Sequence, residues 1–189
     1  MTDNEPKIIA FIGAGCVGKT TLFEAYRTRF AGDDRVSFAA EAAKQYFSTH
    51  EIPDEDRFMA PAQGEIQAMA MSAEQEAYQR GQLVFTDRCV IDYPIYVSAM
   101  GDANGSLELM RRAQPWMHKY LRIYLLDPAG IQFKQTTERR ENAETRAMLH
   151  REYLSYLRRH NISYRLLIGS VEKRMSIVDS ELKDLSIIA

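Results

Sequence analysis

Cysteine, histidine and long apolar runs are scarce in this sequence, and each shortage excludes a class of protein. The two cysteines, Cys16 and Cys89, are too few for a disulfide framework. The four histidines are scattered and lack the spacing of zinc ligands. No apolar run approaches the roughly 20 residues that a membrane-spanning helix needs, and residues 1–5 are too polar for a signal peptide. We therefore expect a cytoplasmic protein without a membrane segment.

The net charge is also small: the sequence has 24 Lys and Arg residues and 26 Asp and Glu residues, which gives −2 at pH 7. This balance conceals an asymmetry: residues 1–110 carry a net charge of −8 and residues 111–175 a net charge of +8. A basic region of this kind is either a surface for a polyanion such as DNA or a pair of solvated helices without a specific partner. The sequence leaves both interpretations open.

The remaining composition is that of an ordinary globular protein, with 46% hydrophobic and 26% charged residues. A length of 189 residues suits one domain with a sizeable core. No internal repeat, linker or low-complexity tract divides the chain. We expect a single domain over residues 1–189, whose oligomeric state the sequence does not indicate.

The strongest motif is Gly-Ala-Gly-Cys-Val-Gly-Lys-Thr at residues 13–20, which matches the pattern GxxxxGK[ST] in full. It lies between an apolar run at 8–12 and a helical pattern at 20–29, which is the context of a phosphate-binding loop. Glycines let the backbone curl so that successive N–H groups point at an anion, and the helix adds its positive end. We expect a nucleotide to be bound by Gly13, Ala14, Gly15, Cys16, Val17, Gly18, Lys19, Thr20 and Thr21.

Two side chains of this motif have chemical roles. The ammonium group of Lys19 would reach the β- and γ-phosphates, and the hydroxyl of Thr20 would hold Mg²⁺. The expected cofactors are therefore ATP and Mg²⁺. An Asn-Lys-x-Asp guanine motif is missing, which favours ATP over GTP without deciding between them.

Short apolar runs alternate with helical patterns along the chain. The expected strands are 7–12, 35–39, 83–86, 121–126 and 164–168, and the expected helices are 20–29, 42–50, 64–79, 93–100, 107–120 and 144–160. The strands lack polar alternation, which indicates parallel strands buried on both faces. The pattern predicts an α/β fold, a three-layer α/β/α sandwich around a parallel five-stranded sheet. Because ligands of such sheets bind at the carboxyl ends of the strands, the other site residues should follow strands.

Asp87 and Arg88 come directly after the third expected strand. A carboxylate in this place holds Mg²⁺ directly or through water, so Thr20 and Asp87 form the expected metal site. The alternative role for Asp87 is a helix cap. The planar guanidinium group of Arg88 suits phosphate contacts, and its alternative role is a structural ion pair. Asp92 faces a similar choice with a weaker signal.

Glu41 follows the second expected strand. A carboxylate near the γ-phosphate can accept the proton of an attacking hydroxyl, which would make Glu41 a catalytic base. The alternative is an acid in the first turn of a helix, where the helix dipole favours negative charge. Chemistry alone does not decide between these roles.

Two further segments carry arginines. We expect a helical lid at about residues 131–146, in which Arg139 and Arg140 would neutralise the phosphoryl group as it moves, and Lys134 and Arg146 are further candidates. The alternative is a solvated charged helix. After the last expected strand, the backbone at Gly169 would touch adenine and Arg174 would lie against its ring. A plain strand-to-helix turn is the alternative there.

Aromatic and amide side chains lie on the segments expected to form the pocket of the phosphoryl acceptor. We expect Tyr46, Gln67 and Asp92 to contact the acceptor, because stacking and hydrogen bonds from polar side chains suit a nucleobase. Ordinary core packing is the alternative for the aromatic residues.

The order of these motifs resembles a known group of proteins. The phosphate loop, Glu41, the Thr-Asp-Arg segment at 86–88 and the Gly-Ser-x-x-x-Arg segment at 169–174 are similar to small AAA-like P-loop ATPases related to the ribosylnicotinamide kinase domain. More broadly they resemble nucleoside and nucleotide kinases. The resemblance covers about residues 7–175, and it implies that Glu41 is the base and that Arg88 steers phosphates. Such kinases usually have a small hydroxyl residue where this chain has Cys89.

The resemblance implies an ATP-dependent kinase that transfers the γ-phosphoryl group to a hydroxyl of a nucleoside, nucleotide or modified-base acceptor. Two alternatives remain. Phage enzymes that phosphorylate 5-hydroxymethyluracil within DNA are built on a similar P-loop kinase, and residues 111–175 fit such a polyanion. The other alternative is a nucleotide-dependent regulatory ATPase that has no small acceptor.

Overall fold

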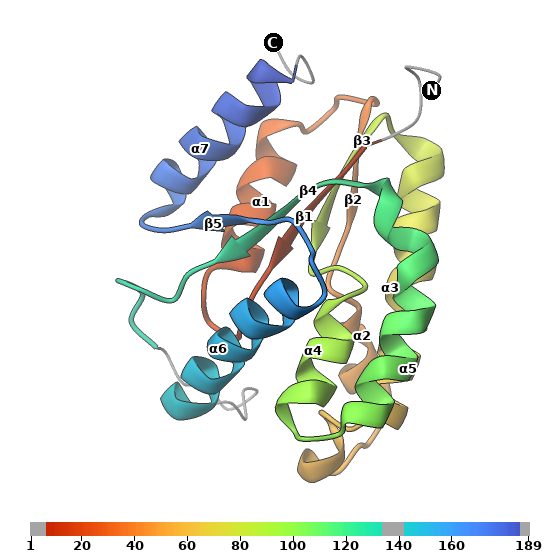
Figure 1. Ribbon diagram of the computed structural model, residues 1–189. Coiled ribbons are helices and arrows are strands. Elements are labelled where there is room, and N and C mark those ends of the chain that lie inside the picture. Colours follow the sequence, from red (N-terminus) through yellow and green to blue (C-terminus); the bar gives the residue numbers. More distant parts are fainter. Residues whose placement is uncertain (1–6, 134–141, 186–189) are drawn as a thin grey trace.

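The computed structural model of the 189-residue chain describes residues 7–133 and 142–185. These residues form a five-stranded parallel sheet with helices on both faces (Figure 1), which confirms the predicted α/β sandwich. In chain order the elements are β1 (Lys7–Ile12), α1 (Lys19–Arg29), β2 (Val36–Ala39), α2 (Ala42–Thr49), the 3₁₀ helix η1 (Asp54–Asp56), α3 (Ala60–Arg80), β3 (Leu83–Asp87), α4 (Asp92–Ala99), α5 (Ala103–Ala113), the 3₁₀ helix η2 (Gln114–Lys119), β4 (Tyr120–Leu126), α6 (Ala143–Arg159), β5 (Arg165–Leu167) and α7 (Val171–Asp184).

The strand order places the ends of three strands together. The order across the sheet is β2-β3-β1-β4-β5, so that β1 is the central strand. Phe11 of β1 pairs with Asp87 of β3, and Ala39 of β2 pairs with Thr86 of β3. The carboxyl ends of β1, β2 and β3 are therefore neighbours, and the residues that follow these strands meet at one edge of the sheet.

Aromatic packing fixes the helix that follows the phosphate loop. Helices α1 and α7 pack together on one face of the sheet, and α3, α4, α5 and α6 lie on the other (Figure 1). Tyr26 of α1 stacks on Phe85 of β3 with ring centroids 4.6 Å apart, and Phe11 stacks on both rings. The Tyr26 hydroxyl also donates to Asp179 of α7 at 2.8 Å. Both ends of the loop between β1 and α1 are thus anchored in the core.

The structure differs from the predicted elements in three places. Helix α3 begins at Ala60 and not at residue 64, and the predicted helix 107–120 is instead α5 followed by the 3₁₀ helix η2. Pro115 lies in the first turn of η2, where its ring and missing N–H prevent α5 from continuing. The sequence analysis did not predict α7. None of the helices in the described ranges has the length and apolar character needed to cross a membrane.

Candidate active site

The segment between β1 and α1 forms a curled loop. Gly13, Cys16 and Gly18 have positive φ values of 139°, 57° and 87°. Gly18 is the N-cap of α1, and a Cβ atom there would lie 3.3 Å from Nη1 of Arg174, so both the backbone conformation and the space favour glycine. The loop ends directly on the amino terminus of an 11-residue helix, which is the arrangement that binds phosphate groups in proteins.

Lys19 is the first residue of α1 and lies inside this curl. Its side chain is 6% exposed, and Nζ donates to the carbonyl oxygens of Gly13 at 2.9 Å and Ala14 at 2.7 Å. Burial, and after it the charge of Arg88, lowers the pKa of Lys19 below its ordinary value. The hydrogen bonds of this ammonium group go to neutral carbonyls, so an anion in the loop would stabilise its charge.

Thr20 and Asp87 form a hydrogen-bonded pair. The Thr20 hydroxyl donates to Oδ2 of Asp87 at 2.7 Å, and Oδ1 of Asp87 is buried without a hydrogen-bond partner among the described residues. Burial raises the pKa of this carboxyl. A hydroxyl beside a partly unpaired carboxylate fits Mg²⁺. The described ranges hold no cluster of three His, Cys, Asp or Glu residues that could hold a metal ion.

Glu41 and Arg88 form an ion pair at the ends of β2 and β3. Oε1 of Glu41 accepts from Nε of Arg88 at 2.6 Å, and the two side chains are 11% and 12% exposed. Burial raises the pKa of Glu41, but the charges of Arg88 and Lys19 outweigh it and hold the pKa at about 2. Glu41 is therefore ionised at neutral pH and held in one orientation next to the phosphate loop.

A second set of contacts holds Arg88 in place. Arg88 has a φ of 80°, which is strained for a non-glycine residue, and its N–H donates to the Phe11 carbonyl at 2.9 Å. Nη1 donates to the Tyr96 hydroxyl at 3.2 Å and lies 3.4 Å from Oδ1 of Asp92, which accepts from the Tyr153 hydroxyl at 2.5 Å. The sequence analysis missed Tyr96 and Tyr153, because a buried tyrosine on a helix looks the same in sequence whether it supports a site or fills the core.

The three predicted acceptor contacts are buried and bonded within the protein. Tyr46 is 3% exposed, and its hydroxyl donates to Glu65 at 2.8 Å. Gln67 is 0% exposed, and its Nε2 donates to the Val90 carbonyl at 2.9 Å. Asp92 is also 0% exposed. This placement differs from the expectation, because packing among α2, α3, α4 and α6 buries these side chains and gives them partners within the protein. Among the described residues, only Oε1 of Gln67 in this set is buried without a hydrogen-bond partner.

Of the two predicted adenine contacts, the Arg174 side chain is placed differently from the expectation. Arg174 is 1% exposed, and its guanidinium group donates to the carbonyls of Val17 at 2.5 Å and Asp127 at 2.7 Å. The side chain thus lies against the back of the phosphate loop instead of projecting towards a ligand ring. Gly169, with a φ of 103°, precedes the N-cap residue of α7 at the same end of the sheet.

The predicted lid falls largely outside what the structure describes. Lys134, Arg139 and Arg140 lie outside the described residues. At the described edges of this segment, Nη1 of Arg146 donates to the Ile131 carbonyl at 3.0 Å.

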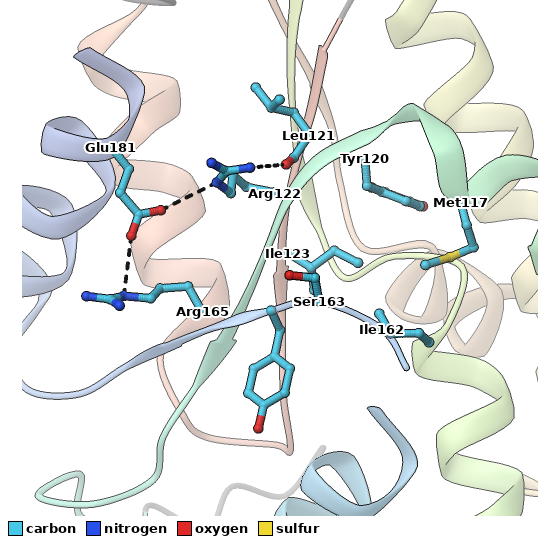
Figure 2. A pocket seen from close by; sticks show the side chains of 10 residues that line it. Met117, Tyr120, Leu121, Arg122, Ile123, Ile162, Ser163, Arg165 and Glu181 are labelled. Carbon is cyan, nitrogen blue, oxygen red and sulfur yellow. Dashed lines mark hydrogen bonds and ion pairs between the residues drawn. The ribbon is translucent and has the colours of Figure 1, made fainter. Parts of the chain in front are cut away.

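Of two hollows among the described residues, only the smaller one adjoins the candidate site. The larger, of about 530 Å³, lies where β4 begins, at the end of the sheet opposite the phosphate loop (Figure 2). Its two arginines, Arg122 and Arg165, both pair with Glu181. The smaller hollow, of about 10 Å³, adjoins Asp87 and Arg88 and is roughly the size of one water molecule. We place the candidate active site at the phosphate loop despite the larger hollow, because Lys19, the Thr20–Asp87 pair and the Glu41–Arg88 pair converge there.

A comparison with protein-family models matches residues 8–174 to a family described as AAA domain. The chain belongs to this family. The matched range contains every described residue of the candidate site in this AAA-domain chain, from the phosphate loop to Arg174. No curated protein sequence matches the chain.

Solved structures share the fold of this AAA-domain chain at low sequence identity. NadR protein in complex with NR superposes with a TM-score of 0.71 and 18% identity, covering 95% of this chain and 49% of NadR. NadR in complex with NAD and AMP-PNP superposes with a TM-score of 0.65 and 18% identity, and the match covers 98% of this chain and 51% of NadR. Deoxyadenosine kinase from M. mycoides, with its products dCMP and dCDP, superposes with a TM-score of 0.58 and 12% identity. The match covers 94% of this chain and 99% of the kinase. The chain spans about half the length of the NadR chains, and the likeness shows that it has the fold of P-loop nucleoside and nucleotide kinases.

Proposed function

We propose that this chain is an ATP-dependent kinase that transfers the γ-phosphoryl group to a hydroxyl of a nucleoside or nucleotide-like acceptor, within one catalytic domain over residues 1–189. The observation that carries the proposal is the meeting of the phosphate loop, the Thr20–Asp87 pair and the Glu41–Arg88 pair at adjoining strand ends. A nucleotide-dependent switch needs only the phosphate loop and the Thr20–Asp87 pair. The Glu41–Arg88 pair supplies a carboxylate for an acceptor hydroxyl, and it therefore favours a kinase.

The nucleotide would be held mainly by backbone and charge. The N–H groups of the loop and of the first turn of α1 would surround the β-phosphate, and Lys19 would exchange its carbonyl partners for phosphate oxygens. Thr20 and Asp87 would hold Mg²⁺, because Oδ1 of Asp87 has no partner in the described part of the chain. When bound, this ion neutralises charge on the phosphate oxygens.

Glu41 would orient the acceptor hydroxyl so that its oxygen faces the γ-phosphorus. A bond forms between these atoms, the bond to the leaving ADP oxygen breaks, and the hydroxyl proton passes to Glu41. A carboxylate with a pKa of about 2 is a weak base, but phosphoryl transfer has a loose transition state in which little proton removal is needed early. Arg88, fixed by Glu41 and Asp92, would face the charge that develops on the transferred group.

The comparisons support the same class of donor and acceptor. One NadR structure holds AMP-PNP, and the deoxyadenosine kinase structure holds nucleotide products. The DNA alternative has less support, since many cations of region 111–175 are already paired within the protein: Arg111 and Arg112 with Glu108, Arg122 and Arg165 with Glu181, and Arg159 with Glu152. DNA therefore enters as one arm of the test.

The test is an acceptor screen with ATP labelled at the γ-phosphate. The protein and Mg²⁺ would be incubated separately with nucleosides, nucleotides, plain DNA and DNA that contains 5-hydroxymethyluracil. We expect label in a nucleoside or nucleotide. A Lys19→Ala variant, shown by circular dichroism to be folded, should transfer none.

Each other outcome has a defined meaning. Label in the modified DNA alone would select the DNA kinase, and release of free phosphate without a labelled acceptor would select the regulatory ATPase. Full transfer by Lys19→Ala would contradict the assignment of the phosphate loop.

A further inference from the structure

Arg174 is a buried cation that touches the phosphate loop from outside. It lies on the first turn of α7, 157 residues after Val17, and is 1% exposed. Nη1 donates to the Val17 carbonyl at 2.5 Å, and Nη2 donates to the Asp127 carbonyl just after β4 at 2.7 Å. One planar group therefore fixes two carbonyls from distant segments, a task that suits arginine better than lysine.

Among the described residues, the charge of Arg174 has no carboxylate within ion-pair distance. In the ranges that the structure describes, its Nε is also buried without a hydrogen-bond partner. The charge of Asp127 acts on Arg174 and favours its charged form. Oδ2 of Asp127 also lies 3.6 Å from His150, and Oδ1 accepts from the Ala129 N–H. An uncompensated buried charge destabilises a fold. An anion held in the neighbouring loop would supply the missing negative charge.

The contact with Val17 also sets the direction of a neighbouring N–H group. A peptide unit is planar and trans, so the carbonyl of Val17 and the N–H of Gly18 point in opposite directions. Because the carbonyl points at Arg174, the Gly18 N–H points away from Arg174. Gly18 has a φ of 87° and Lys19 begins α1, so this N–H belongs to the group of amides at the start of the helix.

We propose that Arg174 is a positioning residue for the nucleotide's phosphates, which holds the Val17–Gly18 peptide so that the Gly18 N–H faces them. The inference rests on the proposed function and assigns Arg174 a role that does not involve the adenine ring. Arg174 could affect nucleotide binding in two ways, through the phosphate loop or by stacking on the base. An arginine that acts through the loop affects every ligand with a triphosphate, whereas an arginine that stacks on a base affects only ligands with that base.

The test compares Arg174→Lys with the matched control Arg165→Lys. Arg165 also contacts α7, through Glu181, but it is 61% exposed and lies on the strand before the turn. Calorimetry with Mg²⁺ would measure the affinities for ATP, GTP and inorganic tripolyphosphate. We expect Arg174→Lys to weaken binding of all three by the same factor, about ten-fold or more, as for one hydrogen bond to a charged group. The ATP-to-GTP ratio should not change, and Arg165→Lys should match the wild type.

A purely structural role for Arg174 would lower the melting temperature without changing the affinity of the folded protein, and that result overturns the inference. Weaker binding of ATP with unchanged binding of tripolyphosphate also overturns it and selects base stacking. If the wild type binds neither ATP nor tripolyphosphate, the proposed function itself fails.

A measurement on the wild type keeps the inference testable if Arg174→Lys does not fold. In an ¹⁵N-correlated NMR spectrum, tripolyphosphate should shift both the Gly18 amide and the Arg174 Nε–H signals, and adenosine should shift neither. Shifts of Arg174 with adenosine alone would overturn the inference.

Discussion

At the scale of single residues, two buried glutamates have pKa values shifted in opposite directions, because their surroundings differ. Glu41 has a pKa of about 2, because Arg88 and Lys19 outweigh its burial. Glu74, 2% exposed, has a pKa raised to about 8 by burial, although Trp116 and Tyr120 donate to its Oε2 at 2.6 Å. The two glutamates therefore differ in protonation because cations lie beside Glu41, whereas burial dominates at Glu74.

The first prediction concerns Glu41. Glu41→Gln removes the negative charge that, in the proposed reaction, would orient the acceptor hydroxyl, so we expect kcat to fall about 100-fold or more while ATP affinity changes little. Steady-state kinetics and nucleotide titration measure the two quantities. Lys44→Gln is the control, because Lys44 lies 3.6 Å from Glu41 but is 62% exposed, and it should change neither. Equal losses in kcat and in ATP affinity would argue against a role in acceptor activation.

The second prediction concerns pH. Between about pH 4.5 and 8, folded Glu74 keeps a proton that the unfolded chain has lost, so its contribution to stability falls as pH rises and is constant above pH 8. Glu74→Gln removes this dependence and keeps an oxygen acceptor for Trp116 and Tyr120. Its stability relative to the wild type should rise between pH 5 and 8, by at most about 1.4 kcal/mol per pH unit.

Urea unfolding at several pH values measures this difference. Glu76→Gln, an exposed position on the same helix, should show no such trend. A pH-independent difference for Glu74→Gln would mean that Glu74 is already ionised in the folded protein.

At the scale of helices and strands, the sequence predicted what is local. All five strands were predicted, because each contains a short, mostly apolar run between helical or turn segments. The loop at 13–20, Glu41 and Asp87–Arg88 were predicted as one site, because each follows a strand and parallel strands end at the same edge. The structure indeed joins Thr20 to Asp87 and Glu41 to Arg88.

Contacts between distant helices were not predictable in the same way. Tyr153 reaches Asp92 across 61 residues, and Arg174 reaches Val17 across 157. Periodicity tells which residues are buried but not which partners they meet, so the sequence did not indicate that Tyr46 and Gln67 are bonded to Glu65 and to the Val90 carbonyl.

The third prediction concerns the junction of α3 and α5, where Gly105 packs against Ala60. A Cβ atom on Gly105 would lie 2.6 Å from Cβ of Ala60 and would crowd Asp102, whose side chain caps α5 by accepting from the Gly105 N–H. We expect Gly105→Ala to destabilise the fold by about 1–3 kcal/mol in urea unfolding, since the two helices must separate. Asn104→Ala, on an exposed position of the same helix turn, should be neutral or slightly stabilising. A stabilised Gly105→Ala would show that the junction is loosely packed.

At the scale of the whole molecule, the two ends of the sheet differ in chemistry. The carboxyl end carries the phosphate loop and the two site pairs, whereas the other end carries the hollow of about 530 Å³ beside Arg122, Arg165 and Glu181 (Figure 2). Nucleotide binding at the carboxyl end would connect β1, α1, β3 and, through Arg174, α7. Such a ligand should therefore stabilise the molecule as a whole against unfolding.

The fourth prediction measures that stabilisation. At a free concentration 100 times its Kd, MgATP should stabilise the folded state by about 2.7 kcal/mol, which raises the Tm of a chain of this size by roughly 5–10 °C. Lys19→Ala should lose most of this rise, and EDTA should reduce it, because Thr20 and Asp87 then lack the ion between them and the phosphates. Arg165→Lys should respond as the wild type does. An equal rise in Lys19→Ala would place the nucleotide outside the phosphate loop, and the hollow where β4 begins would then be the first site to examine by Arg122 substitution.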